Sequence, residues 1–157
     1  MEHKKPYSRF FLMLGTSLVA MYAVMYLNVY EWDHVYFSLT RVYMALLMLV
    51  PMTLIMMGFM WSMYPHKRRN ALIMGGSLVA FVLVTSMVRS QTFVDDTLWM
   101  KAMIPHHSIA ILVSKRADLK DPEVRQLADS IIAAQEREIK QMQRMLARLK
   151  REPAARP

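Results

Sequence analysis

The sequence contains no cysteine, and only four of its 157 residues are glycine. Without cysteine, neither a disulfide nor a thiolate metal site can form. Acidic and basic side chains are also absent from three apolar runs, residues 10–30, 42–64 and 71–88, which are 21, 23 and 18 residues long. A helix needs roughly 20 such residues to cross the hydrocarbon layer of a bilayer. We therefore predict a three-span membrane unit over residues 10–89, with the lipid bilayer as its partner.

The formal net charge of +8 is distributed unevenly. Basic residues precede the first run within residues 1–9, and three more stand together at residues 67–69, between the second and third runs. The loop between the first two runs carries acids instead, within residues 31–34. By the positive-inside rule, the N-terminal lead 1–9 and the 67–69 loop are cytoplasmic, and the remaining loop and everything after Arg89 lie outside. The positive charge thus indicates topology and not binding to nucleic acid.

Residues 90–150 are charged and amphipathic, and they predict an αα-hairpin. Thr92 followed by Asp95 resembles an N-cap with an acidic first turn. Pro105 predicts either a kink or a fresh helix start, and we expect this helix to end near Ala117.

The second hairpin helix has a strong start signal, because Asp121 can cap it and Pro122 suits its first position. We expect it to run to about Lys150 and residues 151–157 to be disordered. The fold class is therefore all-α: three transmembrane helices followed by an extracytoplasmic hairpin. That hairpin can pack on the membrane unit, or pair with a second copy into a four-helix bundle. We favour a homo-oligomer formed through residues 90–150.

A seam of alternating four- and three-residue spacings can be drawn along each hairpin helix, as buried helix contacts require. In the first helix it reads Trp99, Met103, His106, Ala110, Val113 and Ala117. In the second it reads Val124, Ala128, Ile131, Gln135, Glu138, Met142, Met145 and Leu149. The polar exceptions are His106, Gln135 and Glu138, and a carboxylate within a helix contact needs a partner.

These exceptions predict a metal site. An antiparallel hairpin brings together imidazole, thioether and one carboxylate, from Met103, His106, His107, Glu138 and Met142, with Gln135 beside them and Met100 and Met145 at the periphery. Thioether sulfur suits Cu(I) and imidazole suits copper generally. The residues therefore predict a copper ion as the ligand.

The segments MIPHHSIAI (103–111) and DPEVRQLADSIIAAQEREIKQM (121–142) resemble the DUF305 family, and the resemblance covers about residues 93–150. The resemblance implies a ferritin-like helical domain of bacterial extracytoplasmic proteins, some of them associated with copper binding and resistance. The three preceding spans resemble a membrane-anchored branch of that family. The same six residues, Met103, His106, His107, Gln135, Glu138 and Met142, fall on the family's motif positions. The chain departs from the family pattern at Leu112 and Val113, where the family often has Asp and Met, and at Met145, where it often has Trp.

From these patterns we expect a non-enzymatic protein of a bacterial plasma membrane that binds copper for storage, sensing or tolerance. The alternative is a metal-free, membrane-anchored interaction module, in which the histidines and Glu138 only hydrogen-bond and Gln135 sets the helix register. A di-iron enzyme is disfavoured, because such sites need several Glu residues with Glu-x-x-His spacing.

The acidic loop at residues 31–34 and the methionine row of the second apolar run each allow more than one interpretation. Glu31, Asp33 and His34 can be a solvated loop, an extension of the metal site, or a dock for the hairpin. Methionines recur every four residues from Met44 to Met60, but this spacing drifts about 40° per step around a helix. We therefore interpret them as packing or lipid-facing side chains and not as a copper path.

Overall fold

The computed structural model describes residues 5–151, and within that range every regular element is a helix. In chain order the elements are α1 (Lys5–Val24), the 3-10 turn η2 (Trp32–His34), α2 (Leu39–Phe59), the 3-10 turn η3 (Trp61–Met63), α3 (Lys67–Ser90), α4 (Asp96–Arg116) and α5 (Pro122–Arg151). They divide into two compact units. The three-helix unit comprises Met1–Met25 and Thr40–Phe93, and the hairpin unit comprises Tyr26–Leu39 and Val94–Pro157.

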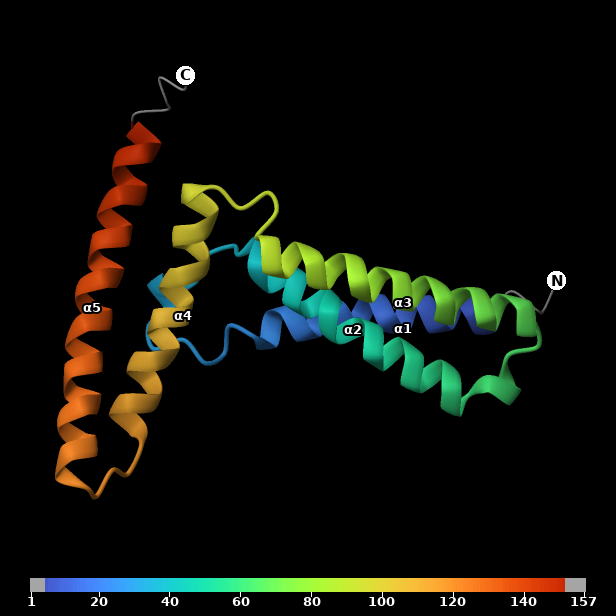
Figure 1. Ribbon diagram of the computed structural model, residues 1–157, viewed down its shortest axis with the longest axis horizontal. Coiled ribbons are helices and arrows are strands. Elements are labelled where there is room, and N and C mark those ends of the chain that lie inside the picture. The colour runs from blue at the N-terminus through green and yellow to red at the C-terminus, as the bar shows by residue number, and fades with distance from the viewer. Residues whose placement is uncertain (1–4, 152–157) are drawn as a thin grey trace. The chain divides into compact units, whose positions relative to one another are not determined.

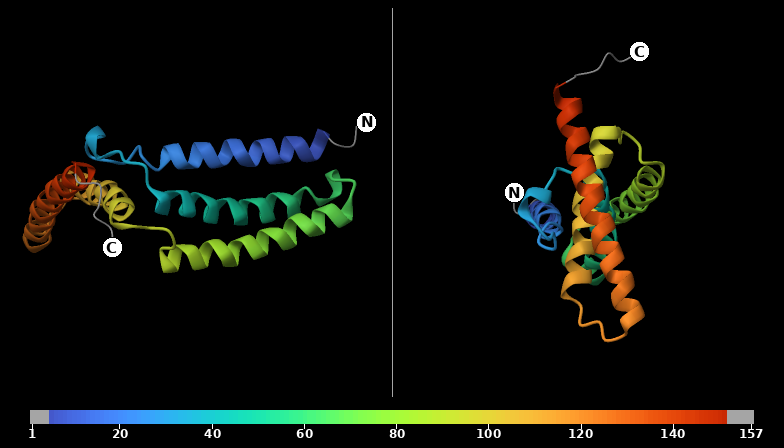
Figure 2. Two further views of the ribbon diagram at one scale, coloured as in Figure 1. Left: turned by 90° about the horizontal axis from the view of Figure 1, so that it is seen from above. Right: turned by 90° about the vertical axis from the view of Figure 1, so that its left-hand side faces the viewer.

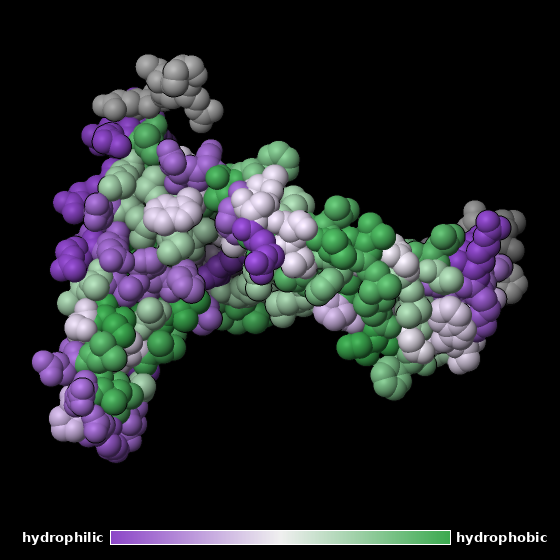
Figure 3. Space-filling model, viewed as in Figure 1, coloured by the Kyte–Doolittle hydropathy of each residue, from purple (hydrophilic) through white to green (hydrophobic). Residues whose placement is uncertain are grey.

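The three-helix unit contains three helices long and apolar enough to cross a membrane, as the charge-free runs predicted. They lie side by side in Figures 1 and 2, and their surface in Figure 3 is largely hydrophobic. The predicted first span was misplaced, since α1 begins at Lys5 and ends at Val24 instead of covering 10–30. The apolar residues after Val24 belong to the hairpin unit, where Tyr26 donates a hydrogen bond to the carbonyl oxygen of Tyr36 at 2.7 Å.

Polar contacts at both ends of the three-helix unit fix the direction of its helices. At one end, Tyr7 near the start of α1 donates to Asn70 Oδ1 near the start of α3 at 2.8 Å, so α1 and α3 run the same way. At the other end, Tyr43 near the start of α2 donates to the carbonyl oxygen of Thr92 just after α3, at 2.7 Å. Helix α2 is therefore antiparallel to α3. The buried core of the unit comprises Tyr7, Phe10, Leu14, Met57 and Tyr64.

The four glycines of the spans do not mark close helix contacts. A Cβ atom placed on Gly15, Gly58, Gly75 or Gly76 would have nothing within 4 Å. The close approach that small residues permit between membrane helices is therefore not used at these positions.

The hairpin unit is built on α4 and α5, which lie side by side (Figures 1 and 2). The N-cap of α4 is Asp95, whose carboxylate accepts from Leu98 N at 2.8 Å, and not the expected Thr92. Pro105 lies inside α4 without ending it. The expected end at Ala117 is confirmed, because Ala117 is the C-cap residue.

Helix α5 starts where its cap signal predicted. The Asp121 carboxylate accepts from Glu123 N at 2.9 Å and from Val124 N at 3.0 Å, and Pro122 is the first helical residue. The helix continues to Arg151. The expected disordered tail, residues 151–157, otherwise lies outside the described residues.

Candidate functional site

A hydrophobic core joins the two helices of the hairpin. Its buried members are Met100, Ile104, Ile111, Ile139 and Met142. A row of buried and half-buried residues on α5 has spacings of four and three: Ala128, Ile132, Gln135, Ile139, Met142, Leu146 and Leu149. This spacing is that of a helix seam packed against a partner helix.

The predicted seam of α4 was displaced by one residue, whereas that of α5 was correct at Ala128, Ile131, Gln135, Met142 and Leu149 and wrong at Val124, Glu138 and Met145, which are exposed. Trp99 and Val113 are 51% and 55% exposed on α4, and Val124 is 48% exposed on α5. Neighbouring residues fill the core instead, with Met100, Ile104 and Ile111 almost fully buried. Both stripes of α4 are apolar, so periodicity alone could not choose between them. The face that is buried also contacts the 26–39 segment, which hydrogen-bonds to Ser108 of α4.

The one-residue shift decides which histidine faces α5. His107 Nε2 lies 2.8 Å from Glu138 Oε2, and the His107 side chain is 12% exposed. His107 Nδ1 lies 2.9 Å from the carbonyl oxygen of Met103. A carbonyl only accepts hydrogen bonds, so Nδ1 carries a proton and donates. The nitrogen that remains for a metal ion is then Nε2, which is the atom directed at the carboxylate.

His106 is exposed, in contrast to its expected place in the seam. Its ring lies at 69° to that of His107, with the centroids 6.3 Å apart. A second imidazole therefore stands beside the His107–Glu138 pair without contacting α5.

The methionines of the predicted site lie mainly in the core beneath the pair. Met100 and Met142 are 4% and 6% exposed, and Met103 packs against the same cluster. Met145 is 37% exposed, and Gln135 is half-buried one turn before Glu138. The structure thus brings His107 and Glu138 into contact and gathers three thioethers in the adjoining core.

These donors fit a copper ion chemically. His107 Nε2 and Glu138 offer nitrogen and oxygen, His106 offers a second nitrogen, and Met103 is one turn from both imidazoles. Hydrogen bonding of Nδ1 to a backbone carbonyl is the arrangement that commonly orients a metal-ligating histidine through its other nitrogen. A metal ion at Nε2 would replace the proton that now joins His107 to Glu138.

The 26–39 segment docks on the hairpin through Ser108, the residue after the histidine pair. Ser108 is fully buried, and its Oγ accepts from Tyr30 N at 2.7 Å and lies 2.9 Å from His34 Nδ1. His34 is 6% exposed. Of the alternatives left open for this loop, docking on the hairpin is therefore confirmed for His34, whereas Glu31 and Asp33 are 56% and 66% exposed. Ser108 was not among the predicted site residues. Its polar side chain on the same face of α4 as the apolar Ile104 and Ile111 was the available signal.

A salt bridge between α4 and α5 lies beside Tyr30 of the 26–39 segment. Lys115 Nζ donates to Glu136 Oε1 at 2.8 Å and lies 4.4 Å from the centroid of the Tyr30 ring. The hydrogen bond from Lys115 holds the pKa of Glu136 below its ordinary 4.5. The same bond, followed by the contact with Tyr30, raises the pKa of Lys115 above 10.5.

Fold and site together define an all-helical protein that combines three helices capable of crossing a membrane with a hairpin carrying a His–Glu pair. The chain belongs to the DUF305 family, described as a domain of unknown function, which matches residues 84–154. An uncharacterised protein of Acanthamoeba polyphaga mimivirus is 33% identical over 142 residues, which cover 88% of this chain and 91% of that protein. That similarity must extend into the three-helix unit, because it is longer than the matched domain. No solved structure matches the chain.

Proposed function

We propose that this protein is a membrane-anchored metal-binding protein whose hairpin unit binds copper, foremost Cu(I), for storage, sensing or tolerance. The observation that carries the proposal is the orientation of His107. Its Nδ1 is hydrogen-bonded to the Met103 carbonyl, so its Nε2 is directed at Glu138, and the ring centroid of His106 lies 6.3 Å from that of His107.

The choice of copper follows from the donors near that nitrogen. Imidazole suits copper in either oxidation state, and thioether sulfur adds a preference for Cu(I). Met103 and Met142 supply the thioethers, each within about one helical turn of His107 or Glu138 along its own helix. Glu138 is 47% exposed and free to move by the fraction of an ångström that a bound ion requires.

The proposed position of the hairpin relative to the membrane rests on the distribution of basic residues and on the division of the chain into two units. Residues 26–39 and the hairpin belong to one unit, so both lie on the same side of the membrane. The basic residues 67–69 stand at the other end of α2 and α3, which places that end in the cytoplasm by the positive-inside rule. We therefore place the hairpin outside the plasma membrane of a bacterium.

The first test is a Cu(I) titration of the full-length protein in detergent against a competing chelator. We expect the triple variant Met103→Leu/His106→Ala/His107→Ala to lose at least about 100-fold in affinity, since loss of partners that only orient a ligand already costs 10- to 100-fold. The matched control is His66→Gln, which removes a histidine from the three-helix unit. Equal affinity of the triple variant and the wild type would overturn the copper site.

One observation favours a second candidate, a metal-free module that pairs two hairpins. Each helix carries two exposed apolar side chains on one face, Trp99 and Val113 two heptads apart on α4 and Val124 and Met145 three heptads apart on α5. This candidate predicts that chelation leaves thermal unfolding unchanged and that Trp99→Ala reduces oligomerisation. Copper binding predicts instead that chelation lowers the unfolding temperature, because a ligand of the native state stabilises it.

A further inference from the structure

A second group of metal-type donors lies outside the matched family domain. Glu31, Asp33 and His34 each offer one ligand atom, and the three atoms lie within 4.8 Å of one another. His34 Nε2 is 3.8 Å from Glu31 Oε2 and 3.8 Å from Asp33 Oδ1. These distances exceed those of hydrogen bonds. The imidazole nitrogen therefore faces two carboxylates, with room between them.

The protein holds this imidazole in place. His34 is 6% exposed, and its other nitrogen, Nδ1, is 2.9 Å from the buried Ser108 Oγ. A hydroxyl oxygen has two lone pairs, so Ser108 can accept from both Tyr30 N and His34 Nδ1. Binding of a metal ion uses the lone pair of His34 Nε2, and the ring proton is then on Nδ1, where the Ser108 oxygen can accept it. The orientation of a metal ligand by a hydrogen bond from its second nitrogen is the usual arrangement in metal sites.

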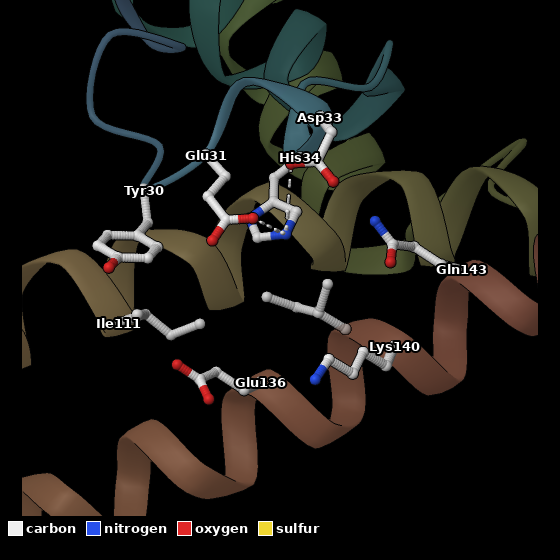
Figure 4. Close-up of a pocket in the computed structure, with 9 residues that line it drawn as sticks. Tyr30, Glu31, Asp33, His34, Ile111, Glu136, Lys140 and Gln143 are labelled. Carbon is white, nitrogen blue, oxygen red and sulfur yellow. Dashed lines mark ion pairs between the residues drawn. The ribbon is translucent and has the colours of Figure 1, made fainter.

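A space adjoins the three donors. A pocket of about 280 Å³ is lined by these residues from the loop, by Ile111 of α4, and by side chains of α5. Figure 4 shows the Glu31 carboxylate and the His34 ring above this space, and Glu136 and Lys140 rising from α5 on its other side. The pocket offers room for water ligands and for entry of an ion.

The spacing of the donors suits a small divalent ion. Nitrogen and oxygen ligands of tetrahedral zinc lie about 2.0–2.2 Å from the metal, which places them about 3.4 Å from one another. The observed 3.8 Å separations must shorten by only a few tenths of an ångström. The Glu31 and Asp33 side chains are 56% and 66% exposed and can make that movement while His34 stays fixed.

We propose that Glu31, Asp33 and His34 form a second metal site, for a divalent first-row ion of zinc-like chemistry, which stiffens the turn through which the 26–39 segment contacts Ser108. Its donors are one imidazole and two carboxylates without sulfur, so it prefers a divalent ion over Cu(I). Two carboxylates neutralise the charge of the ion, and the fourth position opens toward the pocket. This site is independent of the copper proposal, since the two share no ligand.

The test uses Zn²⁺ as the probe, in a calorimetric titration of the full-length protein in detergent. The variant Glu31→Gln/Asp33→Asn keeps the size of both side chains and leaves the His34–Ser108 contact in place. We expect it to weaken zinc binding at least about 10-fold. The matched control Asp118→Asn/Glu123→Gln removes the same charge from exposed positions of the same unit and should bind zinc like the wild type.

Other variants separate this site from the copper site and from general electrostatics. Lys140→Gln should tighten zinc binding, because it removes a positive charge that faces the same pocket. His107→Ala should leave zinc binding unchanged, and Glu31→Gln/Asp33→Asn should leave Cu(I) binding unchanged. The proposal is overturned if the wild type does not bind zinc, or if the loop variant and the control bind it equally.

A structural readout completes the test. Zinc should slow amide hydrogen exchange within residues 26–39 of the wild type, since the ion holds three side chains of this loop together. It should not do so in Glu31→Gln/Asp33→Asn. Zinc binding that leaves the exchange of this segment unchanged would place the ion elsewhere and contradict the proposal.

Discussion

The Lys and Arg side chains of the two units have different kinds of contact partner. The described residues of the three-helix unit include no Asp or Glu, and their cations contact carbonyls and rings instead. Lys67 donates to the Trp61 carbonyl at 2.7 Å, Arg41 donates to that of Met25, and Arg69 lies over the Tyr7 ring. In the part of the chain that the structure describes, every ion pair belongs to the hairpin unit. Among the described residues, carboxylates that could bind a metal ion therefore lie in the hairpin unit.

Methionine follows the opposite distribution. Thirteen of the 17 methionines precede Val94, and only four belong to the hairpin. The row along α2 changes surroundings as it winds around the helix: Met44 and Met48 are 37% and 49% exposed, whereas Met56 and Met60 pack against the core. This supports the packing interpretation of that row. The abundance of methionine in the three-helix unit therefore does not by itself mark a metal site, whereas the few methionines of the hairpin lie near the imidazole and carboxylate on which the copper proposal rests.

Of the changes that should affect one unit and not the other, removal of the buried Ser108 hydroxyl from the hairpin unit should have the largest effect. Ser108→Ala leaves Tyr30 N and His34 Nδ1 without their buried partner. Loss of such a partner costs about 1–3 kcal/mol. We expect the opening free energy of residues 26–39, measured by amide hydrogen exchange, to fall by that amount, while exchange in the three-helix unit stays unchanged.

The matched control for that change is Ser130→Ala, which removes an exposed hydroxyl that bonds only within α5. It should leave the 26–39 segment as protected as in the wild type. Equal protection of this segment in both variants would show that the docking contact contributes nothing.

A smaller effect should come from the Lys115–Glu136 bridge, and it should depend on pH. The pKa of Glu136 is lowered, so its contribution to stability is present above pH 4.5 and is lost as the pH falls through the lowered pKa. The pKa of Lys115 is raised, so its contribution is present below pH 10.5 and is lost as the pH rises through the raised pKa. Between these limits, Glu136→Gln should lower the free energy of unfolding by at most about 1 kcal/mol, because both groups are partly solvated.

Thermal unfolding of the wild type and of Glu136→Gln across this pH range measures that difference. The control is Asp118→Asn, whose partner Lys120 is as exposed as Asp118 itself, and which should have no effect. A difference between wild type and Glu136→Gln that persists unchanged well below pH 4.5 would contradict the assignment.

The sequence predicted local structure better than it predicted which surfaces pack together. Charge-free runs located three helices, and the Asp121–Pro122 signal located the start of α5, because these depend on residues close in the chain. The inward face of α4 was misjudged, since the stripes through Trp99 and Met100 are both apolar. Only the docking of a segment about 75 residues away, through Tyr30, His34 and Ser108, distinguishes them. The partnership of His107 with Glu138 follows from that choice of face.

The most direct test of the account is X-ray absorption at the copper edge, made on the copper-loaded full-length protein. The account predicts nitrogen scattering from imidazole in the first shell, together with sulfur, and loss of the imidazole signal in His106→Ala/His107→Ala. A shell of thioether sulfur alone, unchanged in that variant, would place copper among the methionines of the three-helix unit and contradict the central claim.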